Sequence, residues 1–503
     1  MPKNKKKTYN KIKIPSFMNI IKDNNNKQNA VIKRNDLIKG LPNEIIKMCH
    51  FNNPFVSYQC KINFDEILVY NEEQIKNWFN SFTNNFVINY KVKTDFTMFN
   101  FNKKINIIYL TIKIKKNIID NNIDKYWDNI LNTLGNFNIN NDLILDYNNI
   151  KTLPDAFSNI TIGGNLLLNN NLLNTLPDTF GNITIGGNLW LNNNLINILP
   201  YTFNNITVGG NLLLNNNLLN TLPDTFGNIT IGGSLLLNNN RLNTLPDTFS
   251  NITIGGNLLL NNNLLNTLHD TFSNITINGN LLLNNNLLNT LPDTFSNIII
   301  GNNLWLYENQ LNILPKNFGN IKIGGDLLLN NNLLTVLPDN FSNIIVGDSI
   351  FLDYNQLNIL PNTFGNIKVN GTLCLDYNQL VTLPDSFNNI KVGGNLYLND
   401  NLLNKLPDTF CNIKVGGSLT LYRNQLSSLP DTFGNIIVGN NLWLNDNQII
   451  SLPATFYNIT VGGNLYLGHN LLNTQSNIFY NIKIGGNLYF GNNQTIISLI
   501  SGS

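Results

Sequence analysis

Few side chains in this sequence have the type and spacing that metal binding or catalysis requires. Cys49, His50 and Cys60 offer zinc ligands, but no fourth ligand follows at a suitable spacing. The other histidines, His269 and His469, are scattered, and no nucleophile has a base near it in the sequence. We therefore predict a protein that is not an enzyme and that uses no metal and no cofactor, with the N-terminal region as the only place left for an active site.

Most of the chain is a repeat of 23 residues. From Leu153 the pattern LPDTFxNIxIGGNLxLxxNxLxx recurs without insertion or deletion, and the fifteenth unit begins at Gln475. A shortened unit begins at Leu134. Positions in each unit are numbered here from 1 at Leu153. One unit is too small to bury its own apolar side chains, so neighbouring units, called coils below, must stack and share one core.

Several positions of the coil keep one residue type throughout. The fifth position is always Phe, which predicts a stack of rings along one wall of the core. Ile at the eighth position with Ile or Val at the tenth predicts a short strand, and the pattern LxL at positions 14 to 16 predicts a second one. Asn at the nineteenth position, as in Asn171 and Asn332, predicts a ladder of amides bonded to backbone groups at the bend.

The eleventh and twelfth positions form a glycine pair. The replacements in this pair are Asn or Asp, at Asn278, Asn370, Asn302, Asp348 and Asn440. These residue types tolerate a positive φ best, so the pair is predicted to turn the chain sharply. A loop that cradles phosphate is the other interpretation, and it is disfavoured because the pair recurs in every coil.

The segment LxLxxNxLxxLP resembles the leucine-rich-repeat family, whose signature is LxxLxLxxNxL, over roughly residues 134–499. Here Gly replaces the first leucine of that signature, and the apolar residue stands one place earlier. The resemblance implies a mainly β solenoid with a parallel sheet on its concave side. The shifted residue predicts a second sheet of short strands on the convex side. The Asn-rich style also resembles leucine-rich-repeat proteins of giant, mimivirus-like DNA viruses of amoebae, which implies action in a host cytoplasm.

The fifteenth position lies between two inward leucines and must point outward from the concave sheet. It holds leucine or an aromatic residue in most coils, as in Leu213, Trp190 and Tyr397. At about 4.8 Å per strand this column would be roughly 70 Å long. The apolar area of this column would be larger than that of the patches that monomers usually expose. Either a ligand or another copy covers it, or the column only supplies packing between strands.

Later coils replace Asn at the seventeenth and eighteenth positions by Tyr, Asp, Glu, Arg or His. Aromatic residues with scattered charge are typical of binding hot spots, so we predict one partner site on coils spanning 304–470. The acidic character of this stretch favours a partner with basic groups. The other interpretation is that the early coils are recent duplications that have not diverged. The predicted partner-binding residues are Trp305, Tyr307, Phe351, Tyr354, Tyr377, Tyr397, Tyr422, Arg423, Trp443 and Tyr466.

The N-terminal region differs from the repeat in charge. Residues 1–130 hold 22 Lys or Arg and 11 Asp or Glu, and residues 131–503 hold 10 and 19. We predict a flexible basic arm at 1–35, a small α+β domain or cap at 36–130 and the solenoid at 131–499. The string DLIKGLPNEIIKM from Asp36 weakly resembles the start of an F-box. Further on, EEQIKNWFNSF predicts an amphipathic helix, and INIIYLTIKIKKNII predicts one or two strands.

The chain contains no stretch of about 18 apolar residues and begins without an apolar secretory segment, so we predict an intracellular protein that neither enters a membrane nor is secreted. Its four cysteines predict no disulfide framework. Lysines at the ninth position, such as Lys391 and Lys414, form a solubilising edge without interleaved aromatic residues. Nucleic acid is therefore disfavoured as a partner.

These patterns together predict a scaffold for protein–protein interaction that binds its partner on the concave face. Two alternatives stay open. In the first, the apolar column or the segment IISLI near residue 500 pairs with another copy in a structural or self-assembling protein. In the second, residues 36–130 act as an F-box, and the solenoid presents substrates to a ubiquitin ligase.

Overall fold

The fold is described from a computed structural model of the chain. It covers residues 55–65, 87–96 and 104–115 by their backbone, and residues 138–139, 142–411, 413–473, 479, 482–491 and 493. Several regions with predictions lie outside the described residues. They are the basic arm at 1–35, the F-box-like string from Asp36, the candidate ligands Cys49 and His50, the predicted helix at 72–82 and the segment IISLI at 496–500.

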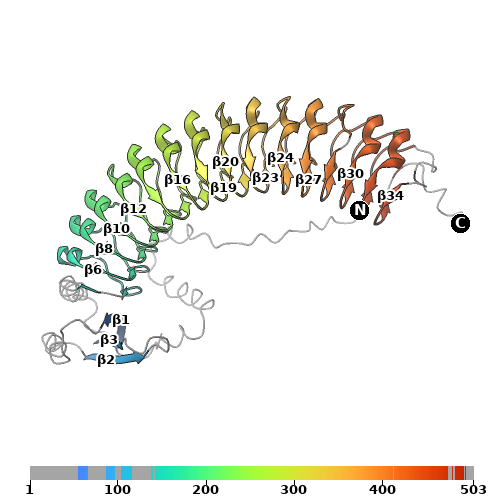
Figure 1. Cartoon of the computed structure of the whole chain (residues 1–503). Coiled ribbons are helices and arrows are strands. Elements are labelled where there is room, and N and C mark those ends of the chain that lie inside the picture. Colours follow the sequence, from blue (N-terminus) through green and yellow to red (C-terminus); the bar gives the residue numbers. More distant parts are fainter. Residues whose placement is uncertain are drawn as a thin grey trace, which may run out of the picture. The chain divides into compact units, whose positions relative to one another are not determined.

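The LxL pattern forms a parallel sheet along the inner side of a curved stack of coils (Figure 1). Each strand covers positions 14 and 15, and each residue pairs with the residue 23 places later, as Leu212 does with Leu235. The strands are β5 (Leu143–Ile144), β7 (Leu166–Leu167), β9 (Leu189–Trp190), β11 (Leu212–Leu213), β13 (Leu235–Leu236), β15 (Leu258–Leu259), β17 (Leu281–Leu282), β19 (Leu304–Trp305), β21 (Leu327–Leu328), β23 (Ile350–Phe351), β25 (Leu373–Cys374), β27 (Leu396–Tyr397), β29 (Leu419–Thr420), β31 (Leu442–Trp443), β33 (Leu465–Tyr466) and β35 (Leu488–Tyr489).

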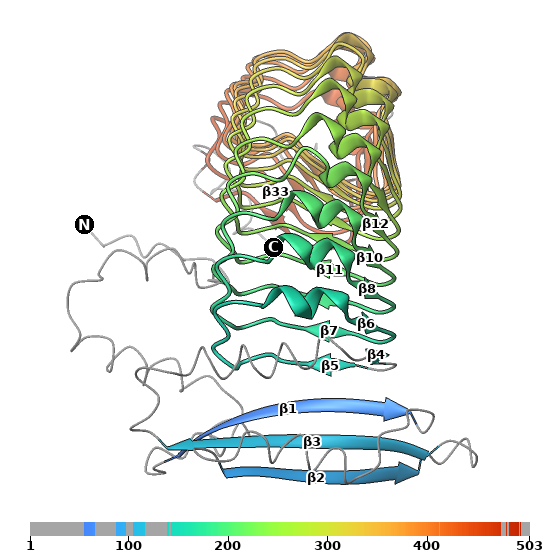
Figure 2. The same ribbon diagram turned by 90° about the vertical axis from the view of Figure 1, so that its left-hand side faces the viewer.

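The ninth and tenth positions form a second set of short parallel strands, as the sequence predicts. It runs along one flank of the stack, beside the inner sheet, whereas short helices cover the convex side on which this sheet was expected (Figures 1 and 2). One sheet contains β4 (Asn138–Ile139), β6 (Thr161–Ile162), β8 (Thr184–Ile185), β10 (Thr207–Val208), β12 (Thr230–Ile231), β14 (Thr253–Ile254), β16 (Thr276–Ile277), β18 (Ile299–Ile300), β20 (Lys322–Ile323) and β22 (Ile345–Val346). The other contains β24 (Lys368–Val369), β26 (Lys391–Val392), β28 (Lys414–Val415), β30 (Ile437–Val438), β32 (Thr460–Val461) and β34 (Lys483–Ile484).

Short 3-10 helices cover the outer side of the stack (Figures 1 and 2). Most begin directly after the proline at position 2, or after His269 in its place, because this residue holds the extended conformation that enters the turn. Three begin later, at the Phe of position 5. The helices are η3 (Asp155–Asn159), η4 (Asp178–Asn182), η5 (Tyr201–Asn205), η6 (Phe226–Asn228), η7 (Asp247–Asn251), η8 (Asp270–Asn274), η9 (Asp293–Asn297), η10 (Phe318–Asn320), η11 (Asp339–Asn343), η12 (Phe364–Asn366), η13 (Asp385–Asn389), η14 (Asp431–Asn435) and η15 (Ala454–Asn458).

The Phe column forms the predicted ring stack. From Phe180 to Phe456, neighbouring ring centroids lie 5.8 to 6.4 Å apart with nearly parallel planes. Strands in a sheet lie only about 4.8 Å apart. Each coil is therefore wider on its Phe side than on its strand side. This difference in width curves the stack, with the LxL sheet inside and the 3-10 helices outside (Figure 1).

The glycine pair was predicted to turn the chain by adopting a positive φ, and this explanation is wrong. No glycine in the described part of the chain has a positive φ. Lack of space favours glycine at the eleventh position instead, because a Cβ on Gly209 would lie 2.1 Å from the carbonyl oxygen of Gly186 in the preceding coil. Where Asn370 replaces this glycine, the flank sheet is interrupted between β22 and β24. The sheet continues past Asn278, which replaces the same glycine in an earlier coil, so a side chain at this position does not by itself interrupt the pairing.

The turn with positive φ lies at the eighteenth position. Asn170 has φ 55°, and the equivalent residue of every later coil through His469 has a φ between 51° and 56°. Early coils have Asn at positions 17, 18 and 19, so the sequence alone could not distinguish the turn residue from its neighbours. The left-handed conformation suits Asn well and suits Tyr, Arg or Glu poorly.

The nineteenth position forms the predicted amide ladder inside the bend. The Asn332 amide donates to the carbonyl oxygens of Leu306 and Leu329, each at 3.0 Å. Its Oδ1 accepts the N–H of Leu311 at 3.1 Å. Asn332 is only 5% exposed, so these bonds satisfy backbone groups that water does not reach.

Three longer antiparallel strands precede the repeat: β1 (Phe55–Asp65), β2 (Val87–Phe96) and β3 (Lys104–Lys115). The last agrees with the strand predicted from INIIYLTIKIKKNII. β2 pairs with β3, and β1 pairs antiparallel with β5, where Lys61 faces Ile144. The described residues include no helix with the length and apolar character needed to cross a membrane.

Candidate functional site

The fifteenth-position column points outward from the inner sheet, because positions 14 and 16 face the core. Leu304 and Leu306 are fully buried, and Trp305 between them is half-buried. The column is therefore less exposed than the sequence analysis expected, since side chains on strands so close together cover one another's flanks. Within the described column, Cys374 and Thr420 are buried, with only 6% and 5% of their surface exposed.

The structure brings some of the ten predicted partner-binding residues together. Tyr354 and Tyr377 stack with ring centroids 4.3 Å apart, and Trp443 and Tyr466 stack at 3.7 Å. Tyr489 extends the second stack, with its ring 4.6 Å from that of Tyr466. Such stacks present large rigid surfaces, which are typical of binding hot spots.

Others among the ten lie in smaller groups. The Trp305 and Tyr307 rings are 5.9 Å apart, and Tyr422 lies 6.2 Å from Trp443. The Arg423 guanidinium lies 5.7 Å from the Tyr422 ring. The last two, Phe351 and Tyr397, lie on either side of Cys374 in the sheet. The small side chains Cys374 and Thr420 thus divide the expected ridge into separate aromatic clusters.

The eighteenth position explains why the later coils differ. Its left-handed backbone is held by Asn in most early coils and by Tyr354, Tyr377, Arg423 or Glu308 further along. Each of these residues costs about 1 kcal/mol more than a residue suited to this conformation. Tyr147 in the shortened first coil has the same conformation. Retaining such residues against this cost favours a role outside folding.

Charged side chains accompany the aromatic clusters. Arg423 forms an ion pair with Asp400 at 3.6 Å, and His469 lies 3.5 Å from Asp446. These pairs reach solvent, so each contributes at most about 1 kcal/mol to stability. These charged residues give the later coils a charge pattern that the early Asn-rich coils lack.

Two aspartates and a cysteine, whose proximity was not predicted from the sequence, meet in the middle of this face. Asp353 and Asp376 occupy the seventeenth position of successive coils, and Cys374 lies beside them. Burial, and then the charge of Asp353, raise the pKa of Asp376 to about 7. Burial also raises the pKa of Asp353 and that of the Cys374 thiol.

Replacing Asp376 by Asn is expected to stabilise the metal-free protein above about pH 7. A carboxyl whose pKa is higher in the folded than in the unfolded state favours folding below about pH 4. That advantage is lost as the pH rises through about 7. The gain should be about 1 to 2 kcal/mol at pH 8, less than the full shift implies because the side chain is not fully buried, and should vanish near pH 4.

Thermal unfolding in the presence of a chelator, at several pH values, measures this gain. Asp446→Asn is the matched control, because Asp446 lies in the same region but is more open to solvent, and it should change stability by less than about 0.5 kcal/mol. An Asp376→Asn gain that is the same at pH 4 and pH 8 would contradict the assignment.

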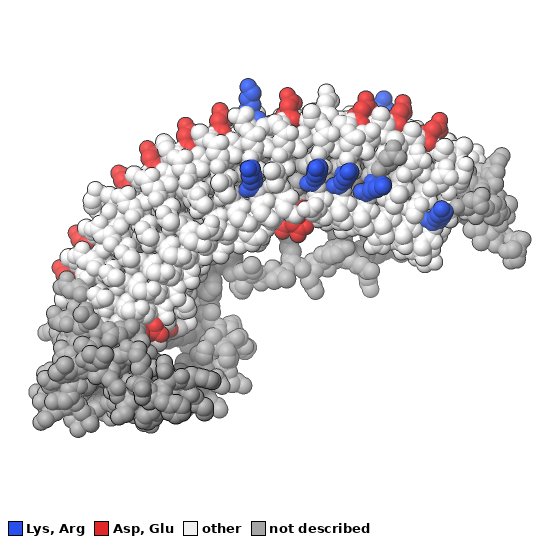
Figure 3. Space-filling model, viewed as in Figure 1, with Lys and Arg blue, Asp and Glu red and all other residues white. Residues whose placement is uncertain are grey.

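The predicted row of lysines at the ninth position lies on the flank of the repeat opposite the turns at the eighteenth position. Lys368, Lys391 and Lys414 lie directly beside one another on paired strands, and all are exposed. Figure 3 shows the basic row on this flank and acidic side chains along the outer rim. No aromatic stack is found among the lysines on the described flank strands, so this edge offers charge without a surface for bases.

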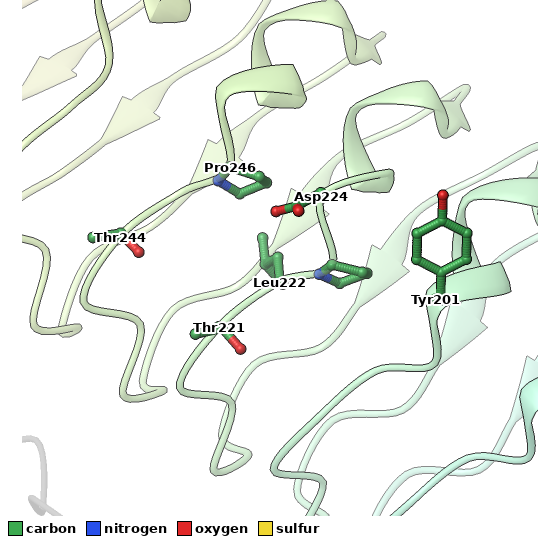
Figure 4. A pocket seen from close by; sticks show the side chains of 7 residues that line it. Tyr201, Thr221, Leu222, Asp224, Thr244 and Pro246 are labelled. Carbon is green, nitrogen blue, oxygen red and sulfur yellow. The ribbon is translucent and has the colours of Figure 1, made fainter.

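A hollow on the repeat lies between neighbouring coils near the prolines at position 2 (Figure 4). Tyr201, Leu222, Asp224 and Pro246 are among its lining residues. A similar hollow one coil further on reaches His269, whose ring lies 3.4 Å from Asp247. Because equivalent positions line both hollows, they follow from the shape of the coil and not from a dedicated site.

The 23-residue register, the LxL sheet and the buried Asn ladder define the fold as a leucine-rich-repeat solenoid. No protein-family model matches the chain, and no curated protein matches its sequence.

Among solved structures, a leucine-rich-repeat protein of Leptospira interrogans is similar, with 25% identity over 71% of this chain and 97% of the other and a TM-score of 0.48. YopM of Yersinia enterocolitica shows 19% identity over 69% and 91%, with a TM-score of 0.29. A chain of the LRIM1/APL1C complex shows 21% identity over 66% and 57%, with a TM-score of 0.42.

Proposed function

We propose that this protein is a non-enzymatic scaffold that binds a protein partner on the concave face of coils 304–470. The observation that carries the proposal is the eighteenth position. There, Tyr, Arg and Glu keep a left-handed backbone that Asn would hold at lower cost. The turn itself does not require these residues, since other coils form it with Asn.

The surface beside this turn has the composition of a binding site. The aromatic clusters of exposed Tyr354 with half-buried Tyr377, and of half-buried Trp443 with Tyr466, offer rigid area without further ordering cost. Several carboxylates, including Asp400 and Asp446, lie among them. A partner that presents Lys or Arg between apolar side chains would complement this pattern. Because the Asn-rich sequence resembles leucine-rich-repeat proteins of giant viruses of amoebae, we propose the cytoplasm of a host cell as the place where this protein acts.

The test compares two triple variants in the same column of the same sheet. Trp305→Ala, Tyr397→Ala and Trp443→Ala together remove three aromatic residues of the later coils. Leu213→Ala, Leu236→Ala and Leu259→Ala remove three half-buried leucines of the early coils and form the matched control. Proteins captured from native cells with the intact chain are identified, and the affinity of each purified partner for the three chains is then measured.

We expect the first triple variant to bind the partner at least about a hundredfold more weakly, since each hot-spot residue contributes on the order of 2 kcal/mol. The control variant should bind within about threefold of the intact chain. Equal binding by all three chains, or a loss only in the early-coil variant, would refute the placement of the site.

Self-association through the same face is the second candidate, favoured by Tyr489, which continues the stack of Trp443 and Tyr466 and is 43% exposed. Sedimentation of the purified chain separates the two functions. A chain that is monomeric at micromolar concentration leaves this face for a different protein, whereas a dimer that Trp443→Ala dissociates would favour self-assembly.

A further inference from the structure

Three metal-ligating side chains lie together on the inner sheet, and this arrangement does not depend on the proposed function. Asp353 comes from one coil, and Cys374 and Asp376 come from the next. One oxygen or sulfur atom of each lies within 4.8 Å of those of the other two. Strands β23 and β25 are paired in register, so the backbone itself fixes this proximity.

The repeat shows how unusual these three residues are. The seventeenth position is Asn in most coils, and the fifteenth is leucine or an aromatic residue in most coils. Here all three side chains that face one another have been replaced by residues that bind metals. Two carboxylates on neighbouring strands repel each other, so this combination is unfavourable unless a proton or a cation lies between them.

Burial provides a second, independent observation. Cys374 is only 6% exposed, and no hydrogen bond to its thiol is found within the described residues. The Oδ1 atom of Asp353 is also buried and, among the described residues, has no hydrogen-bond partner. Buried polar atoms normally have partners, because leaving one unpaired costs roughly 1 to 3 kcal/mol. The Oδ1 atom at the seventeenth position also lacks a partner in other described coils, such as that of Asn330, so the buried Cys374 thiol is what sets this cluster apart.

We propose that Asp353, Cys374 and Asp376 bind a divalent cation of the zinc class. A thiolate ligand selects zinc over magnesium or calcium, which prefer oxygen ligands alone. Zinc bonds of about 2.0 Å to oxygen and 2.3 Å to sulfur place tetrahedral ligands roughly 3.3 to 3.5 Å apart. The three donor atoms, which lie within 4.8 Å of one another, therefore have to approach by about 1.5 Å at most, a change that side-chain rotation can supply.

Binding involves no change of oxidation state. The S–H bond of Cys374 breaks, its proton leaves to solvent, and the sulfur electron pair forms the bond to the metal. The two carboxylates contribute one oxygen each, and Asp376 releases its proton if it holds one. Three protein ligands leave the fourth tetrahedral position open to water or to a donor atom of another molecule.

The experiment uses the full chain, reduced and freed of metal, and titrates it with cobalt(II) and then zinc(II). Cobalt bound to a thiolate shows a sulfur-to-metal charge-transfer absorption, which reports the bond to sulfur directly. We expect one equivalent of cobalt to produce this absorption and zinc to displace it. Cys374→Thr should abolish the absorption and weaken zinc binding at least about tenfold. Asp376→Asn should weaken binding while a sulfur bond persists.

The variants are chosen to fold. Thr420 occupies the same column position as Cys374 and is buried to the same degree, so the sheet accommodates threonine there. Cys411→Ser and Asp446→Asn are the matched controls and should keep both the absorption and the affinity.

Three results would overturn the proposal. They are an intact chain without the charge-transfer absorption, an absorption that survives in Cys374→Thr, and an absorption that only a Cys49→Ser and Cys60→Ser double variant removes. None of these bears on partner binding, which is measured separately with the aromatic variants.

Discussion

Replacing Asn332 by alanine should destabilise the surrounding coils by about 3 to 5 kcal/mol. The change removes an amide that donates to two carbonyl oxygens and accepts one backbone N–H, all in the buried bend. Each backbone group left without a partner costs roughly 1 to 3 kcal/mol. No water replaces the lost partners easily, since the site is only 5% exposed. The damage should stay local, because each coil contacts only its neighbours.

Hydrogen exchange, followed peptide by peptide, measures this effect where it occurs. Amides of the coils from residue 291 to 359 should lose protection in Asn332→Ala, while those of distant coils keep it. Asn330→Ala is the matched control in the same coil, because the Oδ1 atom of Asn330 has no hydrogen-bond partner within the described residues. If both variants lose protection equally, the ladder does not have the stabilising role assigned to it.

Phe295→Ala should cost a similar amount, about 3 to 5 kcal/mol, for a different reason. The Phe295 side chain is completely buried, and its ring lies between those of Phe272 and Phe318 at 6.2 and 6.4 Å. Alanine would leave a cavity in the wall, because the rings above and below are fixed by their own coils. Phe295→Leu fills most of the space and should cost only about 1 kcal/mol.

Calorimetry combined with limited proteolysis measures the loss. Because a long repeat array need not unfold in a single step, the expected sign is a new transition at lower temperature and new cleavage sites near the substituted coil. An alanine variant with the same thermogram as the leucine variant would show that the ring stack contributes little.

The sequence predicted the fold well because its period could be read without an alignment. Once the register of 23 is known, the invariant Phe and Asn positions define the ring stack and the amide ladder directly. The 3-10 helices were not predicted, since the segment after Pro246 has no periodicity of its own. The turn was assigned to the glycine pair because Gly serves both close contact and positive φ, and sequence does not separate these two uses.

The candidate site was predicted only in part. Tyr354 and Tyr377 were both named, but that their rings stack depends on side-chain directions that the sequence does not provide. The cluster of Asp353, Cys374 and Asp376 was missed because two of its members are 21 residues apart. Comparing each residue with the residues about 23 places away would have found it, because residues one coil apart lie side by side in the stack.

The unequal spacing of the two walls gives the repeat an elastic character. Hydrogen bonds between inner strands, such as Leu237 N to the Leu259 oxygen at 2.8 Å, are already at their preferred length and resist stretching. Aromatic pairs are attractive over centroid separations from about 4.5 to 7 Å, so the Phe wall can open or close around its present spacing at little cost. Bending should therefore be absorbed by the outer wall. A partner bound to the inner sheet can then increase or decrease the curvature of the repeat without breaking the hydrogen bonds between strands.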